Sequence, residues 1–190
     1  FWRSDRVLSQ YDEKARGYIE EVGLTESINE RAAVLPYGRK RALEIATTLA
    51  LSPDMLLLDE PMAGMGREDV DRISDLIRRI AENRTVLMVE HNLSVVADLS
   101  DRITVLARGE ILSEGTYAEV VTLLGRNGAG KTSTLLAIMG ILAKRAGSVI
   151  FDGTEIIAMQ PRHIARLGIA LCPEERGIFA SLTVEENLLL

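Results

Sequence analysis

The sequence has little of several residue types that would point to particular classes of protein. Its 190 residues include one cysteine, Cys172, so an intramolecular disulfide is excluded and a reducing compartment is expected. We expect Cys172 to act as a small buried apolar side chain. The 22 lysines and arginines are outnumbered by 28 aspartates and glutamates, and the net charge of −6 argues against a nucleic-acid-binding surface.

Long apolar runs are also missing. The run from Leu135 to Ala143 is too short to span a bilayer, and it is predicted to form a buried helix. No signal peptide is recognised, so a cytoplasmic location is the first expectation. What remains is ordinary for a globular chain: 47% apolar and 26% charged residues, in a length that fits one domain or one domain with a small subdomain.

One glycine-rich segment, Gly125 to Thr132, carries a clear chemical signal. It follows the apolar run 120–124 and precedes the helix-forming run 133–139, which is the order strand, turn, helix. Glycines let backbone N–H groups turn inward, the new helix adds its positive dipole end, Lys131 adds a charge and Thr132 a hydroxyl suited to Mg²⁺. An exposed glycine-rich loop would explain the glycines but not the Gly-Lys-Thr ending. The segment therefore predicts nucleotide triphosphate binding, by Gly125, Asn127, Gly128, Ala129, Gly130, Lys131, Thr132 and Ser133.

A pair of carboxylates follows the continuous apolar run Met55 to Leu58. The length of this run, between Pro53 and a second proline, predicts a buried parallel strand. Ligands of open α/β sheets bind at the carboxyl ends of such strands. Asp59 is therefore predicted to hold Mg²⁺, and Glu60 to orient or deprotonate an attacking water. The alternative is a strand end capped by solvated acids, and the glycine-rich segment favours the functional interpretation.

His91 ends a second predicted strand, 85–89, after Glu90. Because the two strands are expected to end at the same edge of the sheet, we favour a phosphate-sensing role for His91 over a structural one. The other histidine, His163, lies in a polar stretch and is predicted to be a surface residue.

The remaining pattern alternates helices and strands, which predicts an α/β fold with a parallel sheet. Helices are expected at 11–22, 42–50, 68–83 and 93–99, and strands at 103–107, 110–114, 148–151 and 169–172. Thr183 and Glu186 form a capping box for a final helix that needs a partner, because it is too short to be stable alone. The helix that begins near Gly38 has basic residues in its first turn, which opposes the helix dipole unless an anion lies nearby.

Together these motifs resemble those of ATP-binding cassette (ABC) transporter ATPases. Gly125 to Thr132 is similar to a Walker A motif, Met55 to Asp59 with Glu60 to a Walker B motif, and His91 to a switch histidine. The segment 35–39 looks like the signature motif that separates this family from other P-loop NTPases.

Two further segments occupy positions of the same family. Ala63 to Gly66 lies at the D-loop position and Pro173-Glu174 at the Q-loop position. Within the family, the sequence most resembles the two ATPase subunits of branched-chain amino-acid uptake systems.

The resemblance implies a P-loop NTPase (RecA-like) core with a helical subdomain, and ATP and Mg²⁺ as cofactors. It also implies hydrolysis at composite sites between two cassettes arranged head to tail. Lys131, Glu60 and His91 would then be catalytic, Thr132 and Asp59 would hold the metal, and Glu174 would lie at the nucleotide. The signature residues of the partner cassette would close on the same phosphate, namely Pro36, Tyr37, Gly38 and Arg39.

The same resemblance implies partners and a location. These are a second ABC ATPase subunit, membrane permease subunits and no nucleic acid. The chain would lie peripherally on the cytoplasmic face of the inner membrane and drive import of branched-chain amino acids or similar solutes.

The order of the motifs is inverted relative to the family. Residues 1–50 form the expected helical subdomain, 51–120 the Walker B and histidine half of the core, and 121–190 the Walker A and Q-loop half. We hypothesise that the C-terminal half of one subunit is joined near residue 120 to part of its sister, without the sister's opening antiparallel strands and adenine-stacking aromatic residue. Since the sequence begins with Phe1, this hypothesis predicts an intact first Walker A motif upstream.

The layout is also close to a circular permutation of one cassette, because joining Leu190 to Phe1 would nearly restore the family order. Domains tolerate permutation when the new ends are exposed. The core sheet is therefore predicted to bring Lys131 beside Asp59 within one chain. The alternative from another functional class is a non-catalytic nucleotide-binding or docking fragment.

Overall fold

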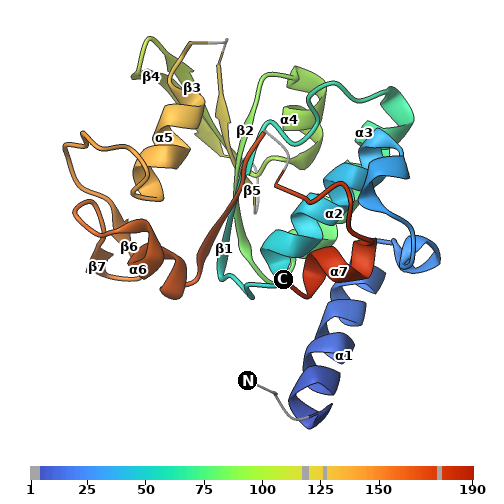
Figure 1. Cartoon of the computed structure of the whole chain (residues 1–190). Helices are drawn as coiled ribbons and strands as arrows, with labels where there is room; N and C mark the ends of the chain where they lie inside the picture. The colour runs from blue at the N-terminus through green and yellow to red at the C-terminus, as the bar shows by residue number, and fades with distance from the viewer. Residues whose placement is uncertain (1–4, 117–119, 126–127, 175–176) are drawn as a thin grey trace.

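The fold is built around a six-stranded sheet whose strands come from two stretches of the chain (Figure 1). The computed structural model describes residues 5–116, 120–125, 128–174 and 177–190. Every neighbouring pair of strands is parallel except β3 and β4. In spatial order the strands are β4 (Glu110–Thr116), β3 (Arg102–Ala107), β5 (Val120–Leu124), β2 (Thr85–Glu90), β1 (Met55–Asp59) and β8 (Ile169–Cys172).

The position of β5 is the main feature of this topology. β5 follows β4 in the sequence, but it lies between β3 and β2 and pairs with both. The strand before the glycine-rich segment is thus an interior strand, two places from β1. The predicted α/β fold with a mostly parallel P-loop NTPase sheet is confirmed.

Alternating side chains of the buried strands supply two apolar cores. Leu56 and Leu58 of β1 pack on one face, and Leu57 packs on the other. Because both faces are covered, these strands read as continuous apolar runs. The first face carries α2 (Tyr37–Leu49), α3 (Arg67–Ala81) and α4 (Leu93–Leu99), and the second carries α5 (Lys131–Ile138) and α6 (Pro161–Arg166).

The helical part of the molecule joins the two ends of the chain. The segment 28–33 runs beside 180–185, with an antiparallel bridge between Arg31 and Thr183 and hydrogen bonds such as Ala32 N to Leu182 O at 2.8 Å. The elements on either side of this pairing are α1 (Asp5–Glu21), η1 (Thr25–Ser27), η2 (Ala32–Val34) and α7 (Val184–Leu188). Helices from the two ends of the chain therefore lie together (Figure 1).

The last helix has the cap and the partner that its sequence predicts. Thr183 Oγ1 accepts a hydrogen bond from Glu186 N at 3.1 Å, and Thr183 N donates to Glu186 Oε2 at 2.8 Å. α7 packs against α1, and Arg16 lies 2.9 Å from Glu185. The short helix is thereby stabilised by tertiary contacts.

The other predicted elements are found, with two corrections to their lengths. β3 and β4 form the expected hairpin, Cys172 is buried and His163 is exposed. The predicted strand 148–151 is shorter, forming a two-stranded hairpin of β6 (Ile150–Phe151) and β7 (Thr154–Glu155).

The prediction of a buried helix from Leu135 to Ala143 is wrong beyond Ile138. Gly140 has a φ of +73°, and Ile141 N donates to Leu136 O, which is the left-handed ending typical of a helix C-terminus. Ile141 is consequently exposed. Within the described residues, no helix combines the length and apolar character needed to cross a membrane.

Candidate functional site

A pocket of about 230 Å³ lies where the glycine-rich segment meets the carboxyl end of β1. Its described lining comes from three separate parts of the chain: Glu60, Gly128, Gly130, Lys131, Thr132, Ser133 and Glu174. Most of these groups are polar or are backbone amides at the start of a helix, so the pocket suits an anionic ligand.

The glycine-rich segment turns sharply between β5 and α5. Gly128 and Gly130 have φ values of +81° and +98°, in the left-handed region that favours glycine. At Gly125 a Cβ atom would lie 2.6 Å from the carbonyl oxygen of Leu106, so only glycine allows this approach to β3. Asn127, which we predicted to contact nucleotide, lies outside the described residues.

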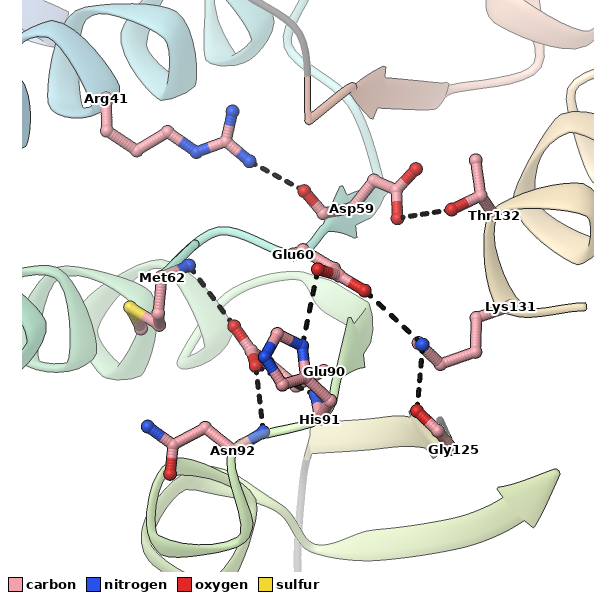
Figure 2. Close-up of polar contacts among 10 residues, drawn as sticks. All are labelled: Arg41, Asp59, Glu60, Met62, Glu90, His91, Asn92, Gly125, Lys131 and Thr132. Atoms are coloured by element: carbon pink, nitrogen blue, oxygen red, sulfur yellow. Dashed lines mark hydrogen bonds and ion pairs between the residues drawn. The ribbon is translucent and has the colours of Figure 1, made fainter. Parts of the chain in front are cut away.

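Lys131 is buried at the first position of α5 and contacts both strands of the site. Its side chain is 4% exposed, its Nζ donates to Gly125 O at 2.8 Å and the same atom lies 3.3 Å from Glu60 Oε1 (Figure 2). The side-chain nitrogen of Lys131 is thus held between a carbonyl and a carboxylate, beside the pocket. The predicted approach of Lys131 to the end of β1 is confirmed.

Asp59 and Thr132 form a second link between β1 and α5. Thr132 Oγ1 donates to Asp59 Oδ1 at 3.0 Å, and Asp59 is 3% exposed. Burial raises the pKa of Asp59 above its usual range, the nearby Glu60 charge adds to this, and the hydrogen bond from Thr132 opposes it.

The carboxylate of Asp59 and the hydroxyl of Thr132 supply oxygen ligands of the kind that Mg²⁺ prefers. The described residues contain no cluster of three or more His, Cys, Asp or Glu side chains placed to share a metal ion. A Mg²⁺ ion here would thus take Asp59 and Thr132 from the protein and its other ligands from phosphate and water, as is usual in nucleotide sites.

Glu60 and His91 also lie together. His91 Nδ1 is 3.3 Å from Glu60 Oε2, although the two residues follow different strands. Glu60 has a φ of +42°, an uncommon conformation for a residue with a side chain, and its N–H donates to Val89 O at 3.0 Å. The carboxylate of Glu60 is thereby placed between Lys131 and His91 (Figure 2).

Glu90 is a buried acid that the sequence did not single out. It is 1% exposed, and its carboxylate accepts hydrogen bonds from the backbone N–H groups of Met62, His91 and Asn92 at 3.2, 2.9 and 3.2 Å. The sequence did contain a signal, because this charged residue directly follows the apolar run 86–89.

Arg41 is a second buried charge without a predicted role. Its guanidinium donates to Glu44 Oε2 at 2.8 Å, to Asp59 O at 2.8 Å and to Pro173 O at 2.7 Å. The sequence could have indicated its burial, because Arg41 lies four residues before Ile45 and so on the same, buried stripe of α2.

The predicted signature residues lie away from this pocket. Its described lining does not include Pro36, Tyr37, Gly38 or Arg39. Gly38 and Arg39 instead line a separate pocket of about 240 Å³ between the end of α1, α2 and α3.

The basic first turn of α2 is satisfied within the chain. Arg39 donates to Ser27 Oγ at 2.8 Å and Lys40 to Ala33 O at 2.7 Å, while Arg41 binds carbonyls and Glu44. These acceptors satisfy hydrogen-bond donors of the three basic side chains, and Glu44 adds a negative charge beside Arg41.

Comparison with known proteins agrees with this geometry. The family model of the ABC transporter matches residues 3–63 and 113–188, so the chain belongs to the ABC transporter family. It is 39% identical to the high-affinity branched-chain amino acid transport ATP-binding protein BraF of Pseudomonas aeruginosa over 122 residues, which are 63% of this chain and 47% of that protein.

Two further comparisons also match ATP-binding proteins of transporters over part of their length. The high-affinity branched-chain amino acid transport ATP-binding protein LivG of Escherichia coli is 36% identical over 117 residues, 60% of this chain and 46% of that protein. A solved ATP-binding cassette of an ABC transporter in its ADP conformation matches with a TM-score of 0.54 and 30% identity, covering 56% of this chain and 42% of that one. The chain spans about half the length of the curated relatives it matches.

Proposed function

We propose that the chain binds ATP with Mg²⁺ and hydrolyses it. The observation that carries the proposal is the double contact of the glycine-rich segment with the end of β1, Lys131 with Glu60 and Thr132 with Asp59. Phosphoryl transfer to water needs little covalent chemistry from the protein, so positioned charges and a water-orienting group account for most of the catalysis.

Each residue has a distinct role in this proposal. Lys131 and the backbone N–H groups at the start of α5 bind the β- and γ-phosphates, and Gly125, Gly128, Ala129, Gly130 and Ser133 shape the loop that does so. Asp59 and Thr132 hold Mg²⁺, which neutralises phosphate charge when bound. Glu60 orients and deprotonates the attacking water, and His91 contacts the γ-phosphate, with Glu174 at the pocket rim.

The assembly is proposed from the same geometry. The residues Pro36 to Arg39 are not part of the described lining of the chain's own pocket, and in this proposal they close on the nucleotide of a second cassette in a head-to-tail pair. The names of BraF and LivG support transport of branched-chain amino acids as the driven process. We further propose that the process is import, that membrane permeases are partners, and that the chain lies peripherally on the cytoplasmic face of the inner membrane.

A second candidate is a nucleotide-binding fragment without turnover. It is favoured by the coverage of about half of each relative's length. Binding and hydrolysis therefore have to be measured separately.

The first test compares the chain with Lys131→Ala. We expect Mg²⁺-dependent phosphate release from ATP by the unchanged chain and a rate at least about 100-fold lower in the variant, because the variant loses the charge that stabilises the transferred phosphoryl group.

The matched control is Lys144→Ala, at an exposed position away from the pocket, which should release phosphate at the unchanged rate. Equal rates in the unchanged chain and Lys131→Ala would remove the catalytic role. Calorimetric ATP binding without release would instead favour the second candidate.

A further inference from the structure

The buried carboxylate of Glu90 joins two segments that carry functional side chains. Its Oε1 accepts from Met62 N at 3.2 Å, and its Oε2 accepts from His91 N at 2.9 Å and Asn92 N at 3.2 Å. Met62 belongs to the turn that follows β1, and His91 and Asn92 follow β2. One side chain thus fixes the backbone of both segments (Figure 2).

The first of these segments is strained. Glu60, two residues before Met62, has a φ of +42°. Such a conformation is unfavourable for a residue with a side chain and persists only where the surroundings hold it. The turn is held by Glu60 N on Val89 O at 3.0 Å, by Ala63 N on Glu60 O at 3.1 Å and by the bond from Met62 to Glu90.

The two held segments place the pair of side chains that meet at 3.3 Å, Glu60 and His91. Glu90 itself does not belong to the described lining of the pocket. The route from Glu90 to the pocket that the contacts provide is the backbone it holds, and through it the positions of these two side chains.

We propose that Glu90 is a positioning residue that sets the mutual geometry of Glu60 and His91, and hence the placement of the attacking water. This inference rests on the proposed ATPase function of the same site. A carboxylate suits the position because both of its oxygens only accept hydrogen bonds, and both face N–H donors. A glutamine would turn its NH₂ group toward one of the two segments and release it.

The test is Glu90→Gln, with Glu82→Gln at an exposed position at the end of α3 as the matched control. We expect kcat for ATP hydrolysis to fall about 10-fold or more, with KM changed less than about twofold, because Lys131 and the phosphate loop are untouched. The control should keep both constants. A kcat of Glu90→Gln within about twofold of the unchanged chain would overturn the proposal.

A double mutant separates positioning from general damage. If Glu90 acts through His91, Glu90→Gln should cost less kcat in a His91→Ala background than alone, since coupled residues are not additive. An equal fold-decrease in kcat in the two backgrounds would show that Glu90 does not act through His91.

A readout that needs no turnover distinguishes failure of this inference from failure of the ATPase proposal. The chain has two histidines, so the imidazole NMR signals of His91 can be assigned against the exposed His163 of α6. Glu90→Gln should shift the His91 signals and leave those of His163 in place. Unchanged His91 signals would overturn the inference even if the chain proved inactive.

A second variant covers the case in which Glu90→Gln does not fold. Glu90→Asp keeps the charge and both acceptors but is one methylene shorter, so it can reach only one of the two segments. The same shift of His91 signals is expected, and its absence would count against the proposal.

Discussion

Asp59 shows at the scale of one residue how a site can oppose stability. Burial, helped by the charge of Glu60, raises the pKa of this carboxyl above its ordinary value of 3.8. The folded chain therefore binds the proton more tightly than the unfolded chain does. Stability from this group is greatest at a pH below 3.8, and it is lost as the pH rises through the folded pKa, so the ionised carboxylate disfavours folding at neutral pH.

Asp59→Asn should consequently stabilise the chain while abolishing Mg²⁺-dependent activity. Asparagine has the same shape and keeps an acceptor for Thr132 Oγ1. We expect a gain in unfolding free energy on the order of 1 kcal/mol at pH 7, as found where a functional group is removed from a strained site. The measurement is urea unfolding between about pH 4 and pH 8, and the gain should shrink toward the acid end.

The exposed substitution Asp71→Asn is the control for a simple change of net charge. A lower unfolding free energy for Asp59→Asn at pH 7 would show that the carboxylate contributes favourably, contrary to the direction of its pKa.

Among the structural elements, α2 is held to the sheet by one guanidinium. Arg41 donates to Asp59 O and Pro173 O, at the carboxyl ends of β1 and β8, and pairs with Glu44. Its side chain is 5% exposed; the bonds to Glu44 and Asp59 O are buried, and the bond to Pro173 O is partly buried. The helix that carries Gly38 is thus attached directly to the edge of the sheet where the pocket lies.

Arg41→Met should lower the unfolding free energy by about 3–5 kcal/mol, because it leaves Glu44 buried without a counter-charge and two strand-end carbonyls without a donor. Urea unfolding followed by circular dichroism measures this loss. The double variant Arg41→Met with Glu44→Met should recover part of it. Unchanged stability of the single variant would show that water or other groups replace the guanidinium.

The elements and the bulk of the site could be predicted from local patterns. The apolar runs identified β1 and β2, the capping box identified α7, and the carboxyl-end rule placed Asp59, Glu60 and His91 at one edge. Local patterns could flag Glu90 and Arg41 as buried charges but could not predict their roles, because each also binds backbone groups of distant segments. The end of α5 was missed because the apolar run continues past Gly140, and the left-handed turn there outweighs the apolar pattern.

On the scale of the whole molecule, motif order in the chain does not decide where the motifs lie. The two ends meet through the pairing of 28–33 with 180–185, and the pocket combines residues after β1 with residues after β5. A parallel sheet permits this because each strand contributes its carboxyl end to the same edge, whatever its order in the sequence. The hypothesis that two sister subunits were joined near residue 120 stays a prediction, and it is tested by looking for an intact first Walker A motif in the upstream DNA.

The interior position of β5 makes the two stretches of the chain depend on one another. β2 and β3 do not pair with each other, and each pairs with β5. A fragment of residues 1–116 would keep β1, β2, β3 and β4 but lose the strand that connects them. It would expose strand edges and apolar side chains that the complete sheet covers.

Residues 1–116 expressed alone should therefore lack a cooperative thermal transition, and co-expression with residues 120–190 should restore one. A tag on one fragment, co-purification and circular dichroism melting measure both effects. The control is the full chain with a Gly-Ser linker inserted between Thr116 and Val120, which should melt cooperatively because it keeps β5. If residues 1–116 melted cooperatively at the temperature of the full chain, β5 would be dispensable, and the sheet order would not explain how the two stretches form one site.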